Sequence, residues 1–420
     1  MSPSFNRNFM ASENNSEVSQ GDEEMSVYKK DANAVVTFHV HYGPTEKISK
    51  NSFKPIMSHQ VFGENECIFG YRSLEIDLNY LHNSARCYVN IKSSGAIKSS
   101  IHKPDDVMES LNPWLPENYC SSEEEFSSMC QKENHELIFG KVIHEFKDKN
   151  RCTIFPNDEV HSSYKITHCD LTNAEFKAFH ARFETYVIWF IDGANFIDLE
   201  DEKWDIFYVY EEVEHPQTLQ VYTSPIGYCT VYKFFAYPEN IRARISQFFI
   251  LPSHHRRGIG STLYKTVFET LKSDPKVIDI TVEEPTSEFQ RIRDIHDGLL
   301  LWKLLKERDL RILSLPMKRL FSVIKELKIG KKQSNRLYDI LCGLSTINDK
   351  VSYQEYLTNI KNRIERENKE KINYSKCLRQ DSQTSPSFIS DQVSLLLNEF
   401  KSYTRDIEIS IEYIKNRLDK

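Results

Sequence analysis

The stretch most suited to chemistry is QFFILPSHHRRGIGS, residues 247–261, in which a predicted strand is followed by two arginines and two glycines. Gly258 and Gly260 let backbone N–H groups approach an anion, and the N-terminus of the helix that follows adds a partial positive charge. Arg256 and Arg257 bring formal positive charge to the same place. These features predict a cradle for a pyrophosphate group.

Residue content distinguishes this stretch from two common phosphate-binding motifs. A P-loop needs Gly-Lys-Ser/Thr after the second glycine, and a dinucleotide fingerprint needs a third glycine. A metal site at His254 and His255 would need a third ligand nearby, and adjacent side chains diverge, so we interpret them as basic neighbours of the phosphate and expect no metal. An ordinary tight turn with the same glycines stays open.

A second candidate is the acidic pair Glu283 and Glu284, which follows the predicted strand at residues 277–282. Successive side chains of a strand alternate faces, so one carboxylate can face a cleft while the other faces solvent or a cation. A carboxylate partly buried in an apolar cleft has a raised pKa and can take the proton that an ammonium loses before its nitrogen attacks a thioester. Two surface acids at a strand end would show the same pattern.

The elements that must position these residues can also be predicted. Runs of β-branched and aromatic residues predict strands at residues 187–191, 204–210, 227–235 and 245–251. A helix with one apolar face follows Gly260 and stops at Asp274-Pro275, before the strand at residues 277–282. Strand, glycine turn, helix and strand form a β-α-β unit.

Composition divides the chain into four predicted segments. Residues 1–33 are rich in Ser, Asn and Glu, which predicts a disordered leader. Residues 34–150, with alternating strands such as residues 74–80, predict a small α+β domain. Residues 151–305 carry the candidate chemistry, and residues 306–420 carry amphipathic helices. The predicted fold class is α+β.

Charge and cysteine content limit the function. Lys+Arg 54 against Asp+Glu 61 gives a net charge of −7, which disfavours sequence-independent DNA binding and suits a basic partner. The 9 cysteines include no C-x-x-C pair, as expected in a reducing compartment. Because no apolar run reaches about 18 residues, we expect no membrane span, and we expect no secretion signal.

Acidic residues gather before and along one predicted strand. They are Asp198, Glu200, Asp201, Glu202, Asp205, Glu211, Glu212 and Glu214. Such a run favours either a rim that attracts a lysine-rich peptide or a solvated loop and hairpin, and the sequence leaves both open.

The glycine loop resembles the acyl-CoA loop of the GCN5-related N-acetyltransferase superfamily, which reads Gln/Arg-x-x-Gly-x-Gly/Ala. The matching residues are His255-Arg-Arg-Gly258-Ile-Gly260, with His255 in place of Gln or Arg. The resemblance implies an N-acetyltransferase fold with a mixed central sheet. It also implies that backbone groups of residues 248–250 hold the acetyl and pantetheine parts of acetyl-CoA.

Longer motifs resemble the type B histone acetyltransferase catalytic subunits. These are HQVFG (59–63), FGY (69–71), FIDLEDEKW (196–204), GYCTVY (227–232), YP (237–238), RISQ (244–247) and DITVEEP (279–285). The resemblance runs from about residue 53 to the C-terminal helices. It implies transfer of acetyl from acetyl-CoA to lysine in the N-terminal tail of newly synthesised histone H4.

The family resemblance also implies roles for residues. The general base is Glu283, and Glu284 is a second acid. Acetyl-CoA contacts fall on Phe248, Phe249, Ile250, His255, Arg256, Arg257, Gly258, Ile259, Gly260 and Ser261. Tail contacts fall on Glu64, Asn65, Glu66, Tyr232, Lys233 and Phe234, where the uncharged Asn65 weakens the attraction and Lys233 contributes through its backbone.

The expected partners are the histone H4 tail, with histone H3 as its carrier, and a WD-repeat histone-binding subunit, with no direct nucleic acid or membrane contact. The expected location is nuclear and cytoplasmic. Because no cysteine lies in the loop or beside Glu283, direct transfer is expected. Two alternatives remain, an acetyltransferase acting on other proteins or small amines and a histone-binding escort with little catalysis.

Overall fold

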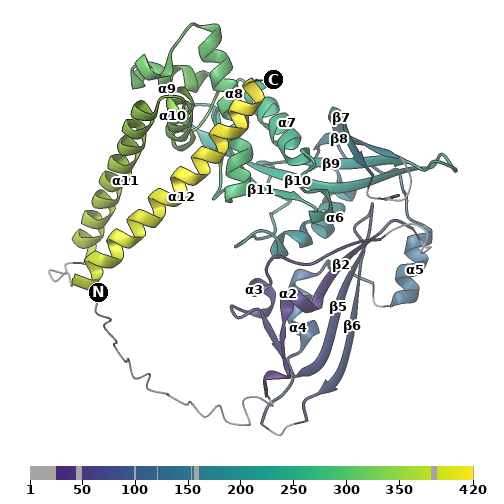
Figure 1. The fold of residues 1–420 in the computed structure, drawn as a ribbon. Helices are drawn as coiled ribbons and strands as arrows, with labels where there is room; N and C mark the ends of the chain where they lie inside the picture. The colour runs from purple at the N-terminus through teal and green to yellow at the C-terminus, as the bar shows by residue number, and fades with distance from the viewer. Residues whose placement is uncertain are drawn as a thin grey trace, which may run out of the picture. The chain divides into compact units, whose positions relative to one another are not determined.

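The computed structural model describes residues 25–43, 50–98, 101–120, 122–152, 154–155, 160–379 and 386–419 (Figure 1). These fall into two compact units. The first unit contains Met1–Asn134 and Ala178–Phe196, and the second contains His135–Lys177 and Ile197–Lys420. The predicted leader at residues 1–33 lies mostly outside the described residues, but its last part is structured, because residues 29–31 form a short strand.

The first unit is built on a four-stranded sheet of order β3-β2-β5-β6, formed by β3 (Lys50–Phe53), β2 (Val36–His41), β5 (Tyr71–Leu81) and β6 (Cys87–Ala96). The expected alternation in β5 is confirmed, since Leu74, Ile76, Leu78 and Tyr80 are buried. A second small sheet pairs β1 (Lys29–Asp31) with β4 (Cys67–Phe69). Short helices complete the unit: α2 (Ala32–Val35), α3 (His59–Phe62), α4 (Val107–Leu111), η1 (Asn112–Trp114) and α5 (Glu123–Gln131).

The strand predicted at residues 187–191 is wrong. This segment continues a 3-10 helix, η2 (Glu184–Trp189), whose residues are all buried in the first unit. The Trp189 carbonyl accepts hydrogen bonds from the backbone of Ile56 and Met57, and the Tyr186 ring lies 4.4 Å from that of Tyr80. A short apolar run buried on every side has no periodicity, so sequence cannot distinguish a strand from a helix there.

The second unit contains a six-stranded mixed sheet of order β12-β11-β10-β9-β8-β7. Its strands are β7 (Lys141–Arg151), β8 (His161–Cys169), β9 (Trp204–Glu214), β10 (Val221–Ala236), β11 (Asn240–Ile250) and β12 (Val277–Val282). Neighbouring strands are antiparallel except β11 and β12, which are parallel and are joined through α7 (Ile259–Ser273). The predicted β-α-β unit and the mixed sheet are therefore confirmed.

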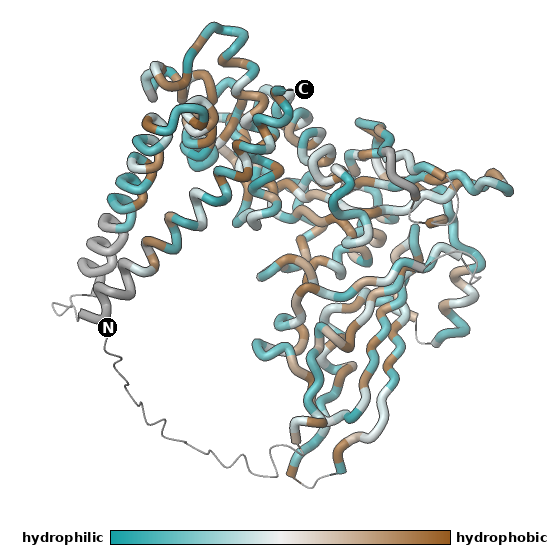
Figure 2. Tube along the Cα trace, in the orientation of Figure 1, coloured by the Kyte–Doolittle hydropathy of each residue, from teal (hydrophilic) through white to brown (hydrophobic). Residues whose placement is uncertain are grey.

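Helices follow the sheet to the C-terminus. They are α8 (Ser287–Glu307), η4 (Ile312–Ser314), α9 (Met317–Glu326), α10 (Lys331–Thr346), α11 (Lys350–Arg379) and α12 (Pro386–Leu418), while α6 (Ala174–Phe183) and η3 (Pro252–His254) lie earlier in the chain. Buried Asp294 of α8 joins two later helices, through Arg336 at 2.7 Å and Ser410 at 3.3 Å. Hydrophilic and hydrophobic residues mix along the long helices (Figure 2), and none of the described helices is long and apolar enough to cross a membrane.

Candidate active site

The loop between β11 and α7 presents the N-terminus of a helix. Gly258 is the N-cap of α7 and has φ 81°, in the left-handed region. As at any helix start, the first N–H groups of α7, including those of Ile259 and Gly260, lack an intrahelical partner. No side chain of the described residues caps this end. Such a helix end attracts anions in general, and binding of a pyrophosphate by this one stays a prediction.

The two glycines have different structural requirements. At Gly258 an added Cβ would meet no described atom within 4 Å, so glycine is favoured there by the positive φ rather than by crowding. At Gly260 an added Cβ would lie 3.4 Å from Ile292 and 3.6 Å from the ring of Phe248. Gly260 therefore brings the start of α7 close to the side chain of Phe248 in β11.

Strand β11 has one open edge beside this loop. Its pairing with β12 runs to Ile245 opposite Val282, whereas its last residues pair with β10, up to Ile250 opposite Gly227. Among the described strands, residues 248–250 are thus paired on one side, and Ser246 and Gln247 lie at an irregularity in the register with β10. Backbone groups of alternate residues point away from β10 and are available for an extended ligand.

His255 is tied to this open edge. Its Nε2 donates a hydrogen bond of 2.8 Å to the carbonyl oxygen of Ile250, which is the last residue of β11. The side chain therefore holds the loop against the strand end. Arg256, beside it, is exposed and adopts φ 64°, an uncommon value for a residue with a side chain.

Arg257 differs from the expectation that its charge faces a phosphate. Its side chain is only 10% exposed, and its Nε and Nη2 both lie 2.9 Å from Asp148 Oδ2 in β7. Its guanidinium also lies over the ring of Tyr164 in β8. Burial opposes the charged form, but the hydrogen bonds to Asp148 and the negative charge of Glu211 raise the pKa of Arg257 overall. Its charge is thus balanced within the protein.

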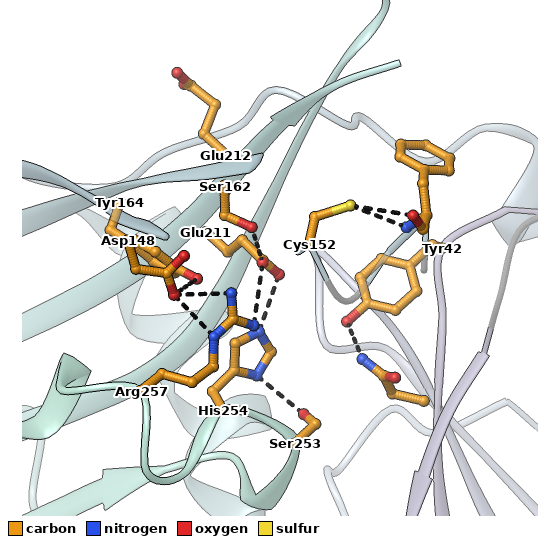
Figure 3. A network of polar contacts seen from close by, with 12 residues as sticks. Tyr42, Asp148, Cys152, Ser162, Tyr164, Glu211, Glu212, Ser253, His254 and Arg257 are labelled. Atoms are coloured by element: carbon orange, nitrogen blue, oxygen red, sulfur yellow. Dashed lines mark hydrogen bonds and ion pairs between the residues drawn. The ribbon is translucent and has the colours of Figure 1, made fainter. Parts of the chain in front are cut away.

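His254 also points into the protein rather than toward a ligand (Figure 3). Its Nε2 donates to Glu211 Oε2 of β9 at 2.9 Å, and its Nδ1 lies 2.9 Å from the hydroxyl of Ser253. Ser162 of β8 donates to the same Glu211 carboxylate. The described residues contain no cluster of three His, Cys, Asp or Glu side chains that could hold a metal ion.

The two candidate catalytic acids follow β12. The backbone N–H of Glu283 donates to the Ile245 carbonyl at 2.9 Å, and its carboxylate accepts a hydrogen bond of 2.6 Å from the hydroxyl of Ser246. Glu283 is exposed, unlike the partly buried carboxylate expected for a base, because the chain leaves the sheet directly after Val282. Glu284 is exposed too, with φ 32°.

The predicted tail contacts in the first unit divide into two kinds. Glu64 and Asn65 are exposed and line a cavity of about 480 Å³. Glu66 instead accepts hydrogen bonds from the backbone N–H groups of Ser58 at 2.5 Å and His59 at 3.2 Å, at the start of α3. The hydrogen bond from Ser58 is the main reason that the pKa of Glu66 is lowered. Glu66 has a structural role that its position in the sequence does not reveal.

The predicted tail contacts in the second unit alternate along β10. The rings of Tyr232 and Phe234 lie 4.6 Å apart on one face. Lys233 lies on the other face and pairs with Asp205 at 2.9 Å. Burial raises the pKa of Asp205, but hydrogen bonds from His168 and Lys233 and their positive charge lower it overall. Lys233 therefore brings less repulsion to a basic peptide than its charge suggests.

The acidic run does not form one continuous rim. Glu211 is fully buried, and most of these acids have partners within the second unit. The pairs are Glu200 with Lys177, Asp201 with Tyr232, Asp205 with Lys233, Glu211 with His254 and Glu212 with Lys165. Asp198, Glu202 and Glu214 are exposed. Strand alternation and local pairing explain this dispersal.

Three residues of the site have roles that the sequence did not predict. Ser246 lies just before the predicted acetyl-CoA contacts, and its position in that strand is the signal that could have indicated it. Asp148 offered no such signal, because it is 109 residues from Arg257 in sequence. Glu211 was named only as a member of the acidic run, and its buried contact with His254 was not predicted.

The mixed sheet, the incomplete pairing of β11 with β12 and the glycine-led start of α7 define an acetyltransferase of the GCN5-related class. In agreement, the acetyltransferase (GNAT) family model matches residues 171–288, and the model of the histone acetyl transferase HAT1 N-terminus matches residues 28–192. The chain belongs to the family of type B histone acetyltransferase catalytic subunits.

Curated relatives resemble the chain over most of its length. The human histone acetyltransferase type B catalytic subunit is 28% identical over 407 residues, covering 93% of this chain and 94% of the human one. The mouse protein of the same description is 29% identical, and the match covers 93% of this chain and 95% of the mouse one. A relative from Dictyostelium discoideum is 30% identical, and the match covers 76% of this chain and 65% of the length of that relative.

Proposed function

We propose that the protein transfers acetyl from acetyl-CoA to lysine ε-amino groups in the N-terminal tail of newly synthesised histone H4, with Glu283 as general base. GCN5-related acetyltransferases use acetyl-CoA. The observation that carries the proposal is the contact of Glu283 with Ser246, because it attaches a carboxylate to β11 where the open edge of this strand begins.

The residues around that edge fit acetyl-CoA. Apart from the Ile250 carbonyl, which accepts from His255, the open side of residues 248–250 offers backbone groups to the pantetheine arm. The uncapped start of α7 offers N–H groups to the pyrophosphate. Phe248 is half-buried and supplies apolar surface at the same place. The side chain of Arg256 is exposed, so Arg256 rather than Arg257 is the arginine of the loop that can contact a phosphate group.

The chemistry needs one proton acceptor. A lysine ammonium gives a proton to Glu283, and its nitrogen then attacks the thioester carbonyl carbon. The C–S bond breaks as the thiolate of CoA leaves, and the thiolate takes up the second proton that the nitrogen loses when the amide forms. The exposure of Glu283 lets an incoming lysine reach the carboxylate, and Ser246 holds it in place. Glu284 adds negative charge beside the base, which favours approach of a cation.

Direct transfer is supported by the state of the nearest cysteine in the sheet. Cys229 of β10 lies opposite Phe248 in the strand register. It is fully buried, and burial raises its pKa strongly, so the thiol stays protonated and inaccessible. Cys229 is therefore unsuited to carry an acetyl group.

The histone specificity is proposed from the family and from the exposed carboxylate of Glu64. The relatives are described as histone acetyltransferases, and the cavity that Glu64 and Asn65 of this chain line together with Lys29 offers one exposed carboxylate to a basic tail. We further propose that histone H3 accompanies H4, that a WD-repeat histone-binding subunit is the partner, and that the protein acts in cytoplasm and nucleus.

The test is acetylation by the purified full chain, read by mass spectrometry. An H4 tail peptide is compared with a polyamine and with a tail peptide whose lysines are replaced by arginine. We expect acetyl-lysine on the H4 peptide alone. Preferred acetylation of the polyamine would favour a small-amine acetyltransferase, and full-strength peptide binding without turnover would favour a histone escort.

A further inference from the structure

The loop between β11 and α7, residues 251–258, is fastened to the sheet by buried charged residues. We define the anchor cluster as Asp148, Tyr164, Glu211, His254 and Arg257 (Figure 3). His254 and Arg257 belong to the loop, whereas Asp148, Tyr164 and Glu211 belong to β7, β8 and β9, in that order. The side chains of Asp148 and Arg257 are 8% and 10% exposed, and those of Glu211 and His254 are 0% exposed.

The contacts of the cluster give each loop residue its own attachment. Arg257 binds one oxygen of Asp148 through two nitrogens at 2.9 Å, and Tyr164 donates to the same oxygen at 3.1 Å. His254 binds Glu211 at 2.9 Å, and Arg257 Nη1 lies 3.9 Å from that carboxylate. Strands of the sheet therefore hold the positions just before Gly258.

Burying several charges is costly unless each is paired in a good geometry. Loops on protein surfaces more often solvate their charged residues, as Arg256 does here. The loop thus places Arg256 and Arg257, which are adjacent in sequence, in opposite environments. The buried one fixes the backbone that leads into α7.

We infer that Arg257, through its ion pair with Asp148, is a positioning residue for acetyl-CoA binding: it holds the backbone N–H groups at the start of α7 in place and does not contact the cofactor phosphates. This inference rests on the proposed use of acetyl-CoA by the loop. It predicts that removing either partner weakens cofactor binding by displacing the loop, whichever sign of charge is lost.

The test measures the Kd of acetyl-CoA by calorimetry for the full-length protein and the variants Arg257→Met, Asp148→Asn and both together. We expect each single variant to raise Kd about tenfold, which corresponds to a loss of about 1.4 kcal/mol in binding free energy. The Kd of the double variant should be no higher than that of the more affected single variant, because the same contact is lost in all three variants. The effects should persist between about 0.05 and 0.5 M salt.

A direct phosphate contact by Arg257 predicts the opposite for Asp148→Asn. That change would release the cation, so acetyl-CoA would bind as well as before or more tightly, and the loss in Arg257→Met would shrink with salt. Either result overturns the inference. In kinetics, the KM for acetyl-CoA should rise while the KM for the H4 peptide stays the same.

The chain contains a closely matched control. Arg363, Asp339 and Tyr403 form the same kind of triad in the C-terminal helices, with the guanidinium 5.4 Å from the tyrosine ring. Arg363→Met should lower thermal stability comparably and leave acetyl-CoA affinity unchanged. An equal loss of affinity in this variant would show a general stability effect and overturn the inference. If the wild-type protein binds no acetyl-CoA, the proposed function itself fails, whereas unchanged Kd in the variants refutes the inference alone.

Discussion

Ser246 Oγ donates a hydrogen bond of 2.6 Å to Glu283 Oε2, which connects the candidate base to the strand that presents the open edge. The pairing of β11 with β12 ends at this point, and the Glu283 backbone donates to Ile245 as the last ladder contact. The end of the parallel ladder therefore positions the carboxylate. A serine on one strand and a glutamate after the next one act as a unit.

Ser246→Ala should lower kcat without changing acetyl-CoA affinity. The carboxylate would lose one hydrogen-bond donor and sample more rotamers, and a lost hydrogen bond to a charged group costs about 1.5–3 kcal/mol at most. We expect a drop of about tenfold, measured by steady-state turnover beside calorimetry. Ser246→Thr keeps the hydroxyl and should recover much of the rate; equal loss in both variants would contradict a hydrogen-bonding role.

Glu283→Gln should reduce turnover by about 10²- to 10⁴-fold at neutral pH, the usual contribution of a general base. Acetyl-CoA affinity should stay near the wild-type value, because the side chain does not belong to the loop. The matched control is Glu288→Gln, an exposed acid in the first turn of α8. Turnover that survives Glu283→Gln unchanged would refute the assignment of the base.

Gly258→Asp should sharply weaken acetyl-CoA binding. The new carboxylate adds negative charge at the helix end proposed for the pyrophosphate, and the positive φ adds backbone strain of about 1–2 kcal/mol. Gly193 has φ 66° and an equally open surrounding among the described atoms, so Gly193→Asp carries the same strain. Calorimetry should show loss of affinity for Gly258→Asp alone, and equal affinities would argue against the cradle.

Glu66→Gln should destabilise the first unit by about 1 kcal/mol, as expected for weakening the cap of a helix start. Because the pKa of Glu66 is lower in the folded state, its contribution is complete above the unfolded value of about 4.3 and disappears as pH falls through the folded pKa. The difference in Tm between wild type and variant should therefore be complete at pH 7, begin to shrink as the pH falls below about 4.3, and disappear as the pH passes through the lower folded pKa.

Glu64→Gln is the counterpart of that variant. The exposed Glu64 has no part in the helix cap, so we expect unchanged Tm and a raised KM for the H4 peptide, with a larger effect at low salt. A raised peptide KM for Glu66→Gln and a normal one for Glu64→Gln would reverse the roles given to the two residues.

Local sequence patterns were enough to specify the β-α-β unit that carries the site. Period-two and helical patterns, Pro252 after the strand and the glycines before α7 are local features, and local conformation follows from neighbouring residues. Glu283 could be named for the same reason, since it directly follows a predicted strand. The C-terminal helices were predicted from their patterns and the mixed sheet from the family resemblance. The 3-10 helix that runs through residues 187–189 was not predicted, because burial on all sides removes periodicity.

Which charges can meet a ligand depends on the tertiary structure alone. Arg256 and Arg257 are identical in type and adjacent, yet one is exposed and the other is paired with Asp148. In the same way, Glu64 is exposed and lines a cavity, whereas Glu66 accepts a hydrogen bond from the backbone of Ser58. The direction of a long side chain depends on the partner that the sheet order brings near. Such partners are distant in sequence, so composition and spacing carry no record of them.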